Sequence, residues 1–264
     1  MDSNNSPVID FHAHYARQPD FLPRLLEEMD RAGVDRICLC TAGEGFDMEP
    51  NEKVREAFER HPDRIIGLGF VQLGGDPPEL VDELHGQGFR GLKLHNPYSG
   101  YDDKAFYPVY ERAERYGMPV LFHTGISMRT PADRKRDVNS DRLRPIRADA
   151  VARAFPQMNL VLAHLGVPWH EEASTLARLH PNVYVDLTGA ASGGWRANKN
   201  ADFYRYHFWW PGGFEKILFG TDILKVEEYA QAKQWHDGIF RELRLPADTL
   251  RKIYGATAAR LLRL

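Results

Sequence analysis

The sequence predicts a (β/α)8 barrel, and three observations support this fold class. Short apolar runs alternate with amphipathic stretches along the chain, which is the order expected of parallel strands joined by helices. Eight such apolar runs can be counted, the number of strands that closes this barrel. The chain has 264 residues, close to the roughly 250 that such a barrel needs. We therefore expect residues 1–264 to form a single TIM-barrel domain.

Each predicted strand is short, rich in Val, Ile, Leu and Phe, and bounded by Gly, Pro or Asp, as buried parallel strands are. The eight runs cover residues 8–14, 35–41, 64–72, 91–96, 119–125, 159–166, 183–189 and 216–222. A doubly wound open sheet is the competing architecture. The G-x-G-x-x-G turn of dinucleotide-binding sheets does not follow the first run, so the barrel is favoured.

The predicted helices lie between these strands, and glycine or proline follows most of them, as expected beyond a last helical turn. The amphipathic stretches are residues 22–32, 52–61, 78–85, 104–116, 148–155, 171–180, 226–243 and 247–262. Two connections are much longer than the others, residues 126–147 after strand 5 and 190–215 after strand 7. Long connections are usually functional, and in a barrel both follow strand ends on the active-site face.

Composition argues against several classes of protein. Hydrophobic residues make up 43% of the chain and charged residues 27%, which is typical of a folded domain with a sizeable core. The net charge of −3 gives no basic face, so we expect no nucleic-acid partner. We also expect no membrane association, because no apolar run approaches the roughly 18 residues of a membrane span. Cys38 and Cys40 are too close in sequence to favour a disulfide, and we expect a cytoplasmic protein.

Polar side chains interrupt the apolar runs where the predicted strands end. His12 and His14 are two residues apart in strand 1, so both should face the barrel interior. His123 ends strand 5, His164 ends strand 6, and Asp222 ends strand 8. Barrel strands carry their catalytic residues at these ends, so we expect the five side chains to meet at one mouth.

The joint pattern of these five residues favours a metal site. Taken singly, a strand histidine is usually a hydrogen-bonded core residue, and an aspartate after Gly-Thr is usually a cap or turn residue. Burying five polar groups together is costly unless something satisfies them, and a divalent ion does so. Imidazole and carboxylate suit Zn²⁺, Mn²⁺ and Fe²⁺, and we expect Zn²⁺ first.

The segments that carry these residues resemble the amidohydrolase superfamily, and within it the amidohydrolase-2 (amidohydrolase-related) branch. The similarity rests on VIDFHAH, GLKLH, MPVLFHTG, NLVLAHLG, HPNVYVDLTG and ILFGTD, and covers nearly the whole chain from residue 8. That branch holds hydrolases and non-oxidative decarboxylases of aromatic or amino-muconate acids. The resemblance implies that His12, His14, His123 and Asp222 are the metal ligands. It also implies that His164 is catalytic, supports a ligand, or binds a second ion.

Lys93 and His95 have the same parity in strand 4, so both should face the barrel interior. Some members of the superfamily use a carbamylated lysine at this strand to bridge two ions, with the strand-6 histidine on the second ion. Otherwise Lys93 is a buried cation that pairs with a carboxylate such as Asp10 or binds the acid group of the substrate. His95 would then touch substrate or orient a ligand. We favour one ion over two.

The expected activity is hydrolysis, in which metal-activated water attacks the C–N or C–O bond of an amide, lactone or ester in a small anionic substrate. Asp222 would carry the proton, and His164 would stabilise the oxyanion or orient the water. The same ligands serve a decarboxylase, which is the alternative. A TatD-type nuclease is less favoured, because it would be expected to carry a carboxylate at strand 4, where this chain has Lys93 and His95.

Candidate substrate contacts come from the two long connections. Arg129 lies in an arginine-rich connection and would pair with a substrate carboxylate, although a solvated loop with internal salt bridges is the favoured interpretation of that connection. Trp195 in the second connection would line the pocket, and Arg196 beside it would bind an acid group. The expected partner is a small molecule, and a homodimer is the default assembly.

Overall fold

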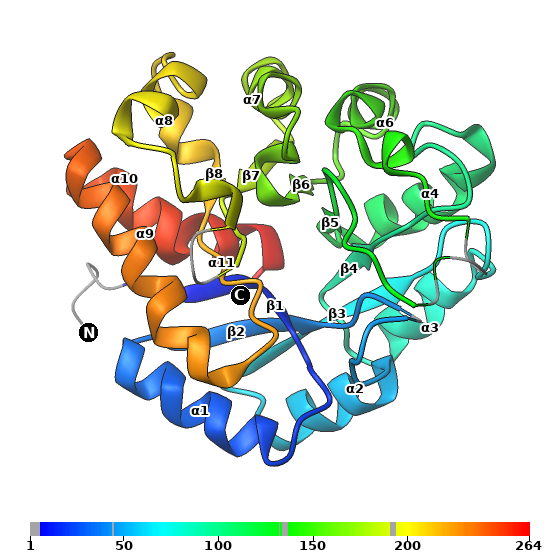
Figure 1. Cartoon of the computed structure of the whole chain (residues 1–264). Helices are drawn as coiled ribbons and strands as arrows, with labels where there is room; N and C mark the ends of the chain where they lie inside the picture. Colours follow the sequence, from blue (N-terminus) through cyan, green and yellow to red (C-terminus); the bar gives the residue numbers. More distant parts are fainter. Residues whose placement is uncertain (1–5, 44, 132, 134–136, 191–193) are drawn as a thin grey trace.

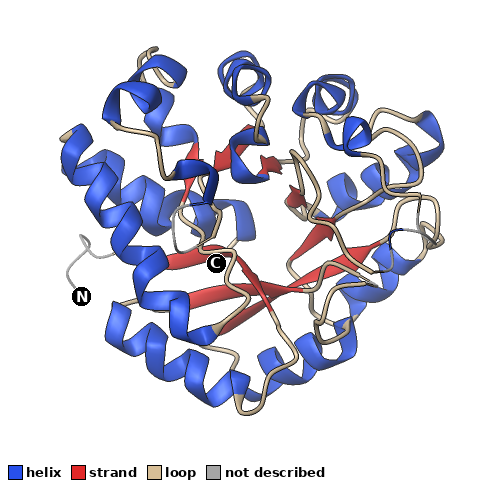
Figure 2. Cartoon of the chain, in the orientation of Figure 1, coloured by secondary structure: helices blue, strands red, loops and turns tan. Residues whose placement is uncertain are grey.

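The computed structural model describes residues 6–43, 45–131, 133, 137–190 and 194–264. Eight parallel strands form one sheet in chain order, with the helices outside it (Figures 1 and 2). The strands are β1 Ile9–His14, β2 Arg36–Cys40, β3 Ile65–Val71, β4 Gly91–Leu94, β5 Val120–Phe122, β6 Leu160–Leu162, β7 Val183–Asp186 and β8 Ile217–Leu218. The predicted (β/α)8 barrel is therefore confirmed.

Backbone hydrogen bonds bring the last strand back to the first. The amide of Phe11 in β1 donates to the carbonyl of Phe219, just after β8, at 2.9 Å. The amide of Thr221 donates to the carbonyl of His12 at 3.1 Å. These bonds close the ring of strands beside β1, so that side chains from β1 and from the segment after β8 meet at the same mouth.

Each predicted amphipathic stretch contains helix, within a few residues; the stretch 247–262 holds two helices joined by a π-helical turn, and one further helix lies in the second long connection. The helices are α1 Phe21–Ala32, α2 Asn51–Arg60, α3 Leu80–Gly86, α4 Tyr107–Tyr116, α6 Ala148–Ala154, α7 His170–Leu179, α8 Ala201–His207, α9 Tyr229–Leu243, α10 Ala247–Arg251 and α11 Thr257–Leu262. Helices α1 and α4 end at Gly33 and Gly117, both left-handed, with φ of 65° and 64°. Glycine adopts this conformation without a steric cost, which explains both stops.

The barrel interior is filled by apolar side chains and closed at its base by the C-terminal helix. The interior cluster includes Ile9 and Phe11 of β1 together with Leu121 and Val161. Residues of α11, among them Leu261, belong to the same cluster. The base of the barrel is therefore packed, and the polar residues gather at the opposite end of the strands.

The two long connections follow β5 and β7, as predicted. The first runs from His123 to the short 3-10 turns that precede α6. Part of the second is helical, since α8 lies within residues 190–215. No helix in the described part of the chain combines the length and apolar character that a membrane crossing requires.

We expect Gly255→Ala to lower the free energy of unfolding by about 1–3 kcal/mol, the usual cost of overpacking. A Cβ at Gly255, in the π-helical stretch between α10 and α11, would lie 1.7 Å from the carbonyl oxygen of Pro7. The backbone ahead of β1 would have to move. Urea unfolding followed by circular dichroism measures the change.

Gly86→Ala in α3 is the matched control, because a Cβ there meets no atom within 4 Å. We expect it to leave stability unchanged or to raise it by up to about 1 kcal/mol. Equal unfolding midpoints for the two variants would contradict the steric explanation.

Candidate metal centre

His12, His14 and Asp222 bring three potential ligand atoms together at the barrel mouth. Nε2 of His12 lies 3.3 Å from Nε2 of His14. Oδ1 of Asp222 lies 3.3 Å from the first of these atoms and 3.0 Å from the second. Ligands of a tetrahedral ion at about 2.1 Å are separated by roughly 3.4 Å. The three atoms therefore have the spacing of ligands around one divalent ion, and they form one of the metal-competent groups among the described residues.

Asp222 reaches this cluster because the backbone turns sharply after β8. Its φ is 55°, in the left-handed region that aspartate tolerates better than most residues. Its amide donates to the carbonyl of His12 at 2.6 Å, which ties the turn to β1. The turn directs the carboxylate back toward the two histidines instead of continuing the strand.

The orientation of His12 is fixed by a carboxylate that sequence reasoning missed. Nδ1 of His12 donates to Oδ2 of Asp186, at the end of β7, at 2.9 Å. The opposite nitrogen, Nε2, therefore presents its lone pair to the cluster. Asp186 lies inside the VYVDLTG segment. The sequence feature that could have revealed this role was an aspartate at the last, inward-facing position of a strand.

Asp186 is itself held ionised by several donors. It accepts from the amide of His164 at 2.8 Å and from the hydroxyl of Thr188 at 2.6 Å. Burial alone would raise the pKa of Asp186, but the neighbouring His12 and His164 and these hydrogen bonds hold it well below its ordinary value. The carboxylate can therefore orient His12 as an anion.

His14 is oriented by a cysteine at the end of β2. Nδ1 of His14 lies 3.5 Å from Sγ of Cys40, which donates to the carbonyl of Ala13 at 3.3 Å. Burial lowers the pKa of His14, but Cys40 and Asp222 favour its charged form and raise the pKa to about 9. The site therefore favours positive charge at this position, as a metal-binding site does.

Hydrogen bonds also determine which nitrogen of His123 is available. The Thr188 hydroxyl donates to Asp186, so Nδ1 of His164 donates to Thr188, at 2.7 Å. Nε2 of His164 then accepts from Nδ1 of His123 at 3.2 Å. This assignment leaves Nε2 of His123 as an acceptor.

Nε2 of His123 is the strongest sign that the site fits a cation. The atom is buried and has no hydrogen-bond partner among the described residues. Burial, followed by the neighbouring His95 and His164, holds the pKa of His123 well below its ordinary value. A neutral imidazole with a buried, unpartnered lone pair would regain free energy by coordinating a metal.

Lys93 and His95 both face the mouth, as their parity predicts. Nζ of Lys93 donates to Nε2 of His12 at 2.8 Å. It does not take the predicted partner Asp10, whose carboxylate accepts from the hydroxyl of Thr221 at 2.6 Å. The ring of His95 lies against that of His123, with centroids 4.1 Å apart. Lys93 therefore belongs to the ligand cluster itself.

The substrate residues predicted from the long connections are less well placed for that role. Arg129 is exposed, and Trp195 is half-buried with Nε1 donating to the carbonyl of Thr188. Arg196 is only 1% exposed, and its guanidinium lies 3.9 Å over the ring of Trp235. It donates to the carbonyls of residues 187, 189 and 190. Arg196 therefore holds the connection after β7, and these donors are not free for a substrate carboxylate.

Comparison with known proteins finds a family model over nearly the whole chain. The model described as amidohydrolase matches residues 9–264. Among curated proteins, 69 residues are 32% identical to protein fluG of Emericella nidulans. That match covers 26% of this chain and 7% of the relative, so it concerns a small part of that protein.

Several solved structures are similar in fold. The uncharacterized TIM-barrel protein Bb4693 from Bordetella bronchiseptica is 21% identical with a TM-score of 0.74, over 97% of this chain and 98% of that one. A 5-carboxyvanillate decarboxylase from Novosphingobium aromaticivorans, complexed with manganese and 4-hydroxy-3-methoxy-5-nitrobenzoic acid, is 15% identical with a TM-score of 0.64, over 100% and 98%. A probable 2-pyrone-4,6-dicarboxylic acid hydrolase from Acinetobacter baumannii with citric acid bound is 16% identical with a TM-score of 0.63, over 97% and 99%.

We expect Asp186→Asn to weaken metal binding about 10–100-fold, the usual effect of removing a carboxylate that orients a histidine ligand. The amide keeps the shape of the side chain but removes the charge that fixes the tautomer of His12. Calorimetric titration of metal-free protein with Zn²⁺ or Mn²⁺ measures the affinity.

Asp149→Asn is the matched control, because Asp149 makes the same kind of bond to His180, at 2.7 Å, away from the mouth. Its metal affinity should equal that of the unmodified protein. An unchanged affinity in Asp186→Asn would show that this carboxylate does not control His12.

Proposed function

The chain belongs to the amidohydrolase family, and from the geometry of its ligand cluster we propose that it is a metal-dependent hydrolase. The observation that carries this proposal is the convergence of His12, His14 and Asp222, whose ligand atoms lie 3.0–3.3 Å apart. His123 lies outside the two groups with metal-like spacing, and we assign it as a further ligand because its buried Nε2 has no hydrogen-bond partner in the described part of the chain. A divalent ion bound there lowers the pKa of water towards about 7 and polarises a carbonyl group.

Asp222 is the residue we assign to proton transfer. Burial favours its neutral form, but His164, His12 and His14 hold the pKa of its carboxyl group well below the ordinary value. Asp222 is therefore an anion that can accept the proton of the attacking water and return it to the leaving group. It lies partly exposed at the mouth, where substrate can reach it.

His164 is the second catalytic residue of the proposal. Its Nδ1 lies 3.8 Å from Oδ2 of Asp222, and its Nε2 bonds to His123. From this position it orients the ligand His123. Its one N–H, on Nδ1, donates to Thr188 and holds the ring in place, so stabilisation of the oxyanion by His164 would require this hydrogen bond to be exchanged for one to the substrate.

The proposed substrate is a small anionic amide, lactone or ester. Lys93 supports the anionic character, because it is a buried cation in contact with the ligand cluster. The similar fold of a protein named for the hydrolysis of 2-pyrone-4,6-dicarboxylic acid agrees with an acidic substrate. Lys93 is therefore our candidate for contact with a substrate carboxylate.

Decarboxylation is the second candidate function. It is favoured by the similar fold of the 5-carboxyvanillate decarboxylase, which was solved with manganese and an aromatic acid. In this reaction the carboxylate would leave as CO₂, and Asp222 or His164 would first take a proton from solvent and then deliver it to the carbon. The same ligand cluster serves both reactions, so an assay must distinguish them.

We propose that one ion is bound, with Zn²⁺ preferred and Mn²⁺ or Fe²⁺ as alternatives. A second group with metal-like spacing consists of His12, His164 and Asp186. Within it, Asp186 already accepts from Nδ1 of His12 and from the amide of His164. The residues of this second group therefore already bond to one another, and Asp186 orients His12, which is a ligand in the first group.

We expect Asp222→Asn to lower kcat by about 10²–10⁴-fold, because an amide cannot accept the proton. The fold should be retained, since the side chain keeps its shape and the amide of residue 222 still bonds to His12. A panel of lactones, esters and amides, run beside CO₂ release from hydroxybenzoates, measures turnover. Release of CO₂ without hydrolysis would favour the second candidate.

Asp47→Asn is the control for this variant, because Asp47 is an exposed aspartate that follows β2 and pairs only loosely with Arg17, at 3.8 Å. It should retain full turnover. Substantial residual activity in Asp222→Asn would contradict the proton-transfer role.

We expect chelation to abolish turnover and added Zn²⁺ or Mn²⁺ to restore it, because the four assigned ligands hold the ion that activates water. Elemental analysis of the active protein should return one ion per chain. Full turnover of metal-free protein would refute the proposed function, whereas two ions per chain would refute only the single-ion assignment.

A further inference from the structure

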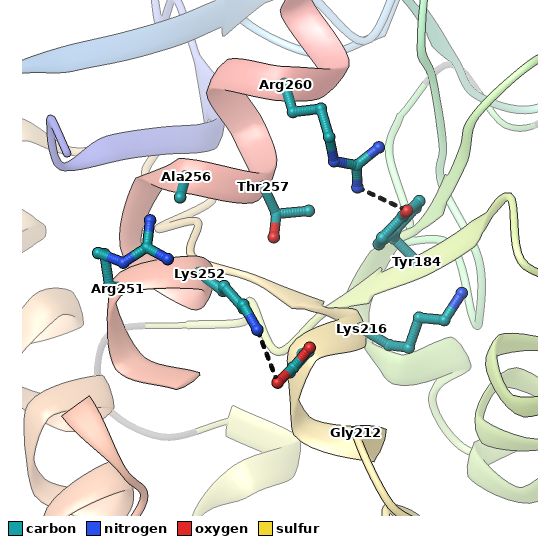
Figure 3. Close-up of a pocket in the computed structure, with 9 residues that line it drawn as sticks. Tyr184, Gly212, Lys216, Arg251, Lys252, Ala256, Thr257 and Arg260 are labelled. Atoms are coloured by element: carbon teal, nitrogen blue, oxygen red, sulfur yellow. Dashed lines mark hydrogen bonds and ion pairs between the residues drawn. The ribbon is translucent and has the colours of Figure 1, made fainter. Parts of the chain in front are cut away.

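A pocket of about 370 Å³ lies at the base of the barrel, at the opposite end of the strands from the ligand cluster. Tyr184 lines it from the beginning of β7, and Lys216 lines it from just before β8 (Figure 3). The remaining wall comes from the C-terminal helices, which contribute Thr257 and Arg260. The pocket is therefore separate from the metal centre, and an inference about it does not rest on the proposed activity.

The lining of this pocket is strongly cationic. Four basic side chains face a single carboxylate, Glu215. The basic residues are Lys216, Arg251, Lys252 and Arg260. Lys252 donates to Glu215 at 2.9 Å and pairs with Asp248 at 2.8 Å, and Arg251 pairs with Asp248 at 2.6 Å. These two cations are compensated, which leaves Lys216 and Arg260.

Lys216 and Arg260 have no carboxylate partner among the described residues. Nζ of Lys216 donates to the carbonyls of His180, Pro181 and Val183, at 3.0, 2.8 and 3.2 Å, so its three N–H donors are all used. Arg260 donates to the hydroxyl of Tyr184 at 2.7 Å (Figure 3). Neutral partners therefore hold both cations in position while leaving their charge unbalanced.

The two cations also lie close to each other. Both are stacked on the ring of Tyr184, with Nζ of Lys216 at 4.7 Å and the guanidinium carbon of Arg260 at 5.6 Å from its centroid. Burial and the charge of Arg260 lower the pKa of Lys216 to about 8. An anion bound in the pocket would reduce this repulsion.

We propose that this pocket binds the oxyanion group, phosphate or carboxylate, of a small molecule through donors of Arg260 and Thr257, with Lys216 contributing its unbalanced charge. Arg260 uses one terminal nitrogen for Tyr184 and retains further donors in a planar fork, the geometry that matches oxyanions. Thr257 stands in the middle of the pocket and supplies a hydroxyl donor (Figure 3). The volume is at the lower end of the range for ligand pockets, which suits a small metabolite.

The test is calorimetric titration of the full chain with inorganic phosphate and, separately, with succinate, at constant ionic strength. We expect one anion per chain from at least one of the two probes. Phosphate binding identifies a phosphoryl ligand, and succinate binding identifies a carboxylate ligand. Arg260→Met should weaken binding at least about tenfold, the effect of losing one charge-assisted hydrogen bond.

Arg90→Met is the matched control, because Arg90 is an exposed arginine just ahead of β4, at the same end of the barrel but outside the pocket. It should change the affinity by less than about twofold, because Arg90 does not line the pocket. Arg260→Lys and Thr257→Val give intermediate losses and keep the test valid if Arg260→Met fails to fold.

Two results would overturn the proposal. One is no binding of either anion to the unmodified protein. The other is binding that is equal in Arg260→Met, Arg260→Lys and the unmodified protein. If the affinity for the anion is equal in those three proteins but changes in Asp222→Asn, the anion binds at the ligand cluster and the base pocket is not an anion site.

Discussion

The hydrogen bond from His12 to Asp186 determines the arrangement of the whole mouth. It crosses from β1 to β7 and commits Nδ1 of His12 as a donor, so Nε2 must present its lone pair towards Lys93 and His14, beside the carboxylate of Asp222. Asp186 also accepts from the amide of His164, which fixes the sharp turn after β6. One buried carboxylate thereby sets the positions of groups from three strands. Through the hydrogen bonds of Thr188 and His164, it also determines which nitrogen of His123 carries the proton.

The same network explains why the site favours a cation. Asp186 and Asp222 are both held as anions, with pKa values below the ordinary range. His12 and His123 are held neutral, because burial and nearby positive charge lower their pKa values. Lys93 and His14 are buried side chains that offset this negative charge; burial lowers the pKa of Lys93, whereas the pKa of His14 is raised to about 9. Burying so many charges together is costly, so a bound divalent ion that coordinates His12, His14 and Asp222 would stabilise the mouth as well as serve chemistry.

The sequence was sufficient for the fold and for the face on which each site residue lies. Strand parity and strand ends predicted that His12, His14 and Asp222 would meet, and the resemblance to amidohydrolases agreed. The hydrogen-bond partners of these side chains were harder to predict, because they depend on contacts across the barrel interior that strand parity does not specify. Lys93 was expected near Asp10 but bonds to His12, since Thr221 occupies Asp10. Arg196 looked available for substrate, but its donors go to backbone carbonyls that no sequence pattern reveals.

The mouth also requires backbone conformations that ordinary strands avoid. β6 and β8 are only three and two residues long, and the chain then turns through left-handed residues at His164 and Asp222, with φ of 60° and 55°. For residues other than glycine this conformation costs roughly 1–2 kcal/mol each. Both turns are held by backbone or carboxylate hydrogen bonds, from His164 to Asp186 and from Asp222 to His12. Continued strands would alternate side chains in and out of the lumen, whereas these turns return both side chains to the cluster. Of the eight non-glycine residues with positive φ in the described part of the chain, two are therefore the residues to which we assign proton transfer and ligand orientation, and hydrogen bonds to the mouth hold both.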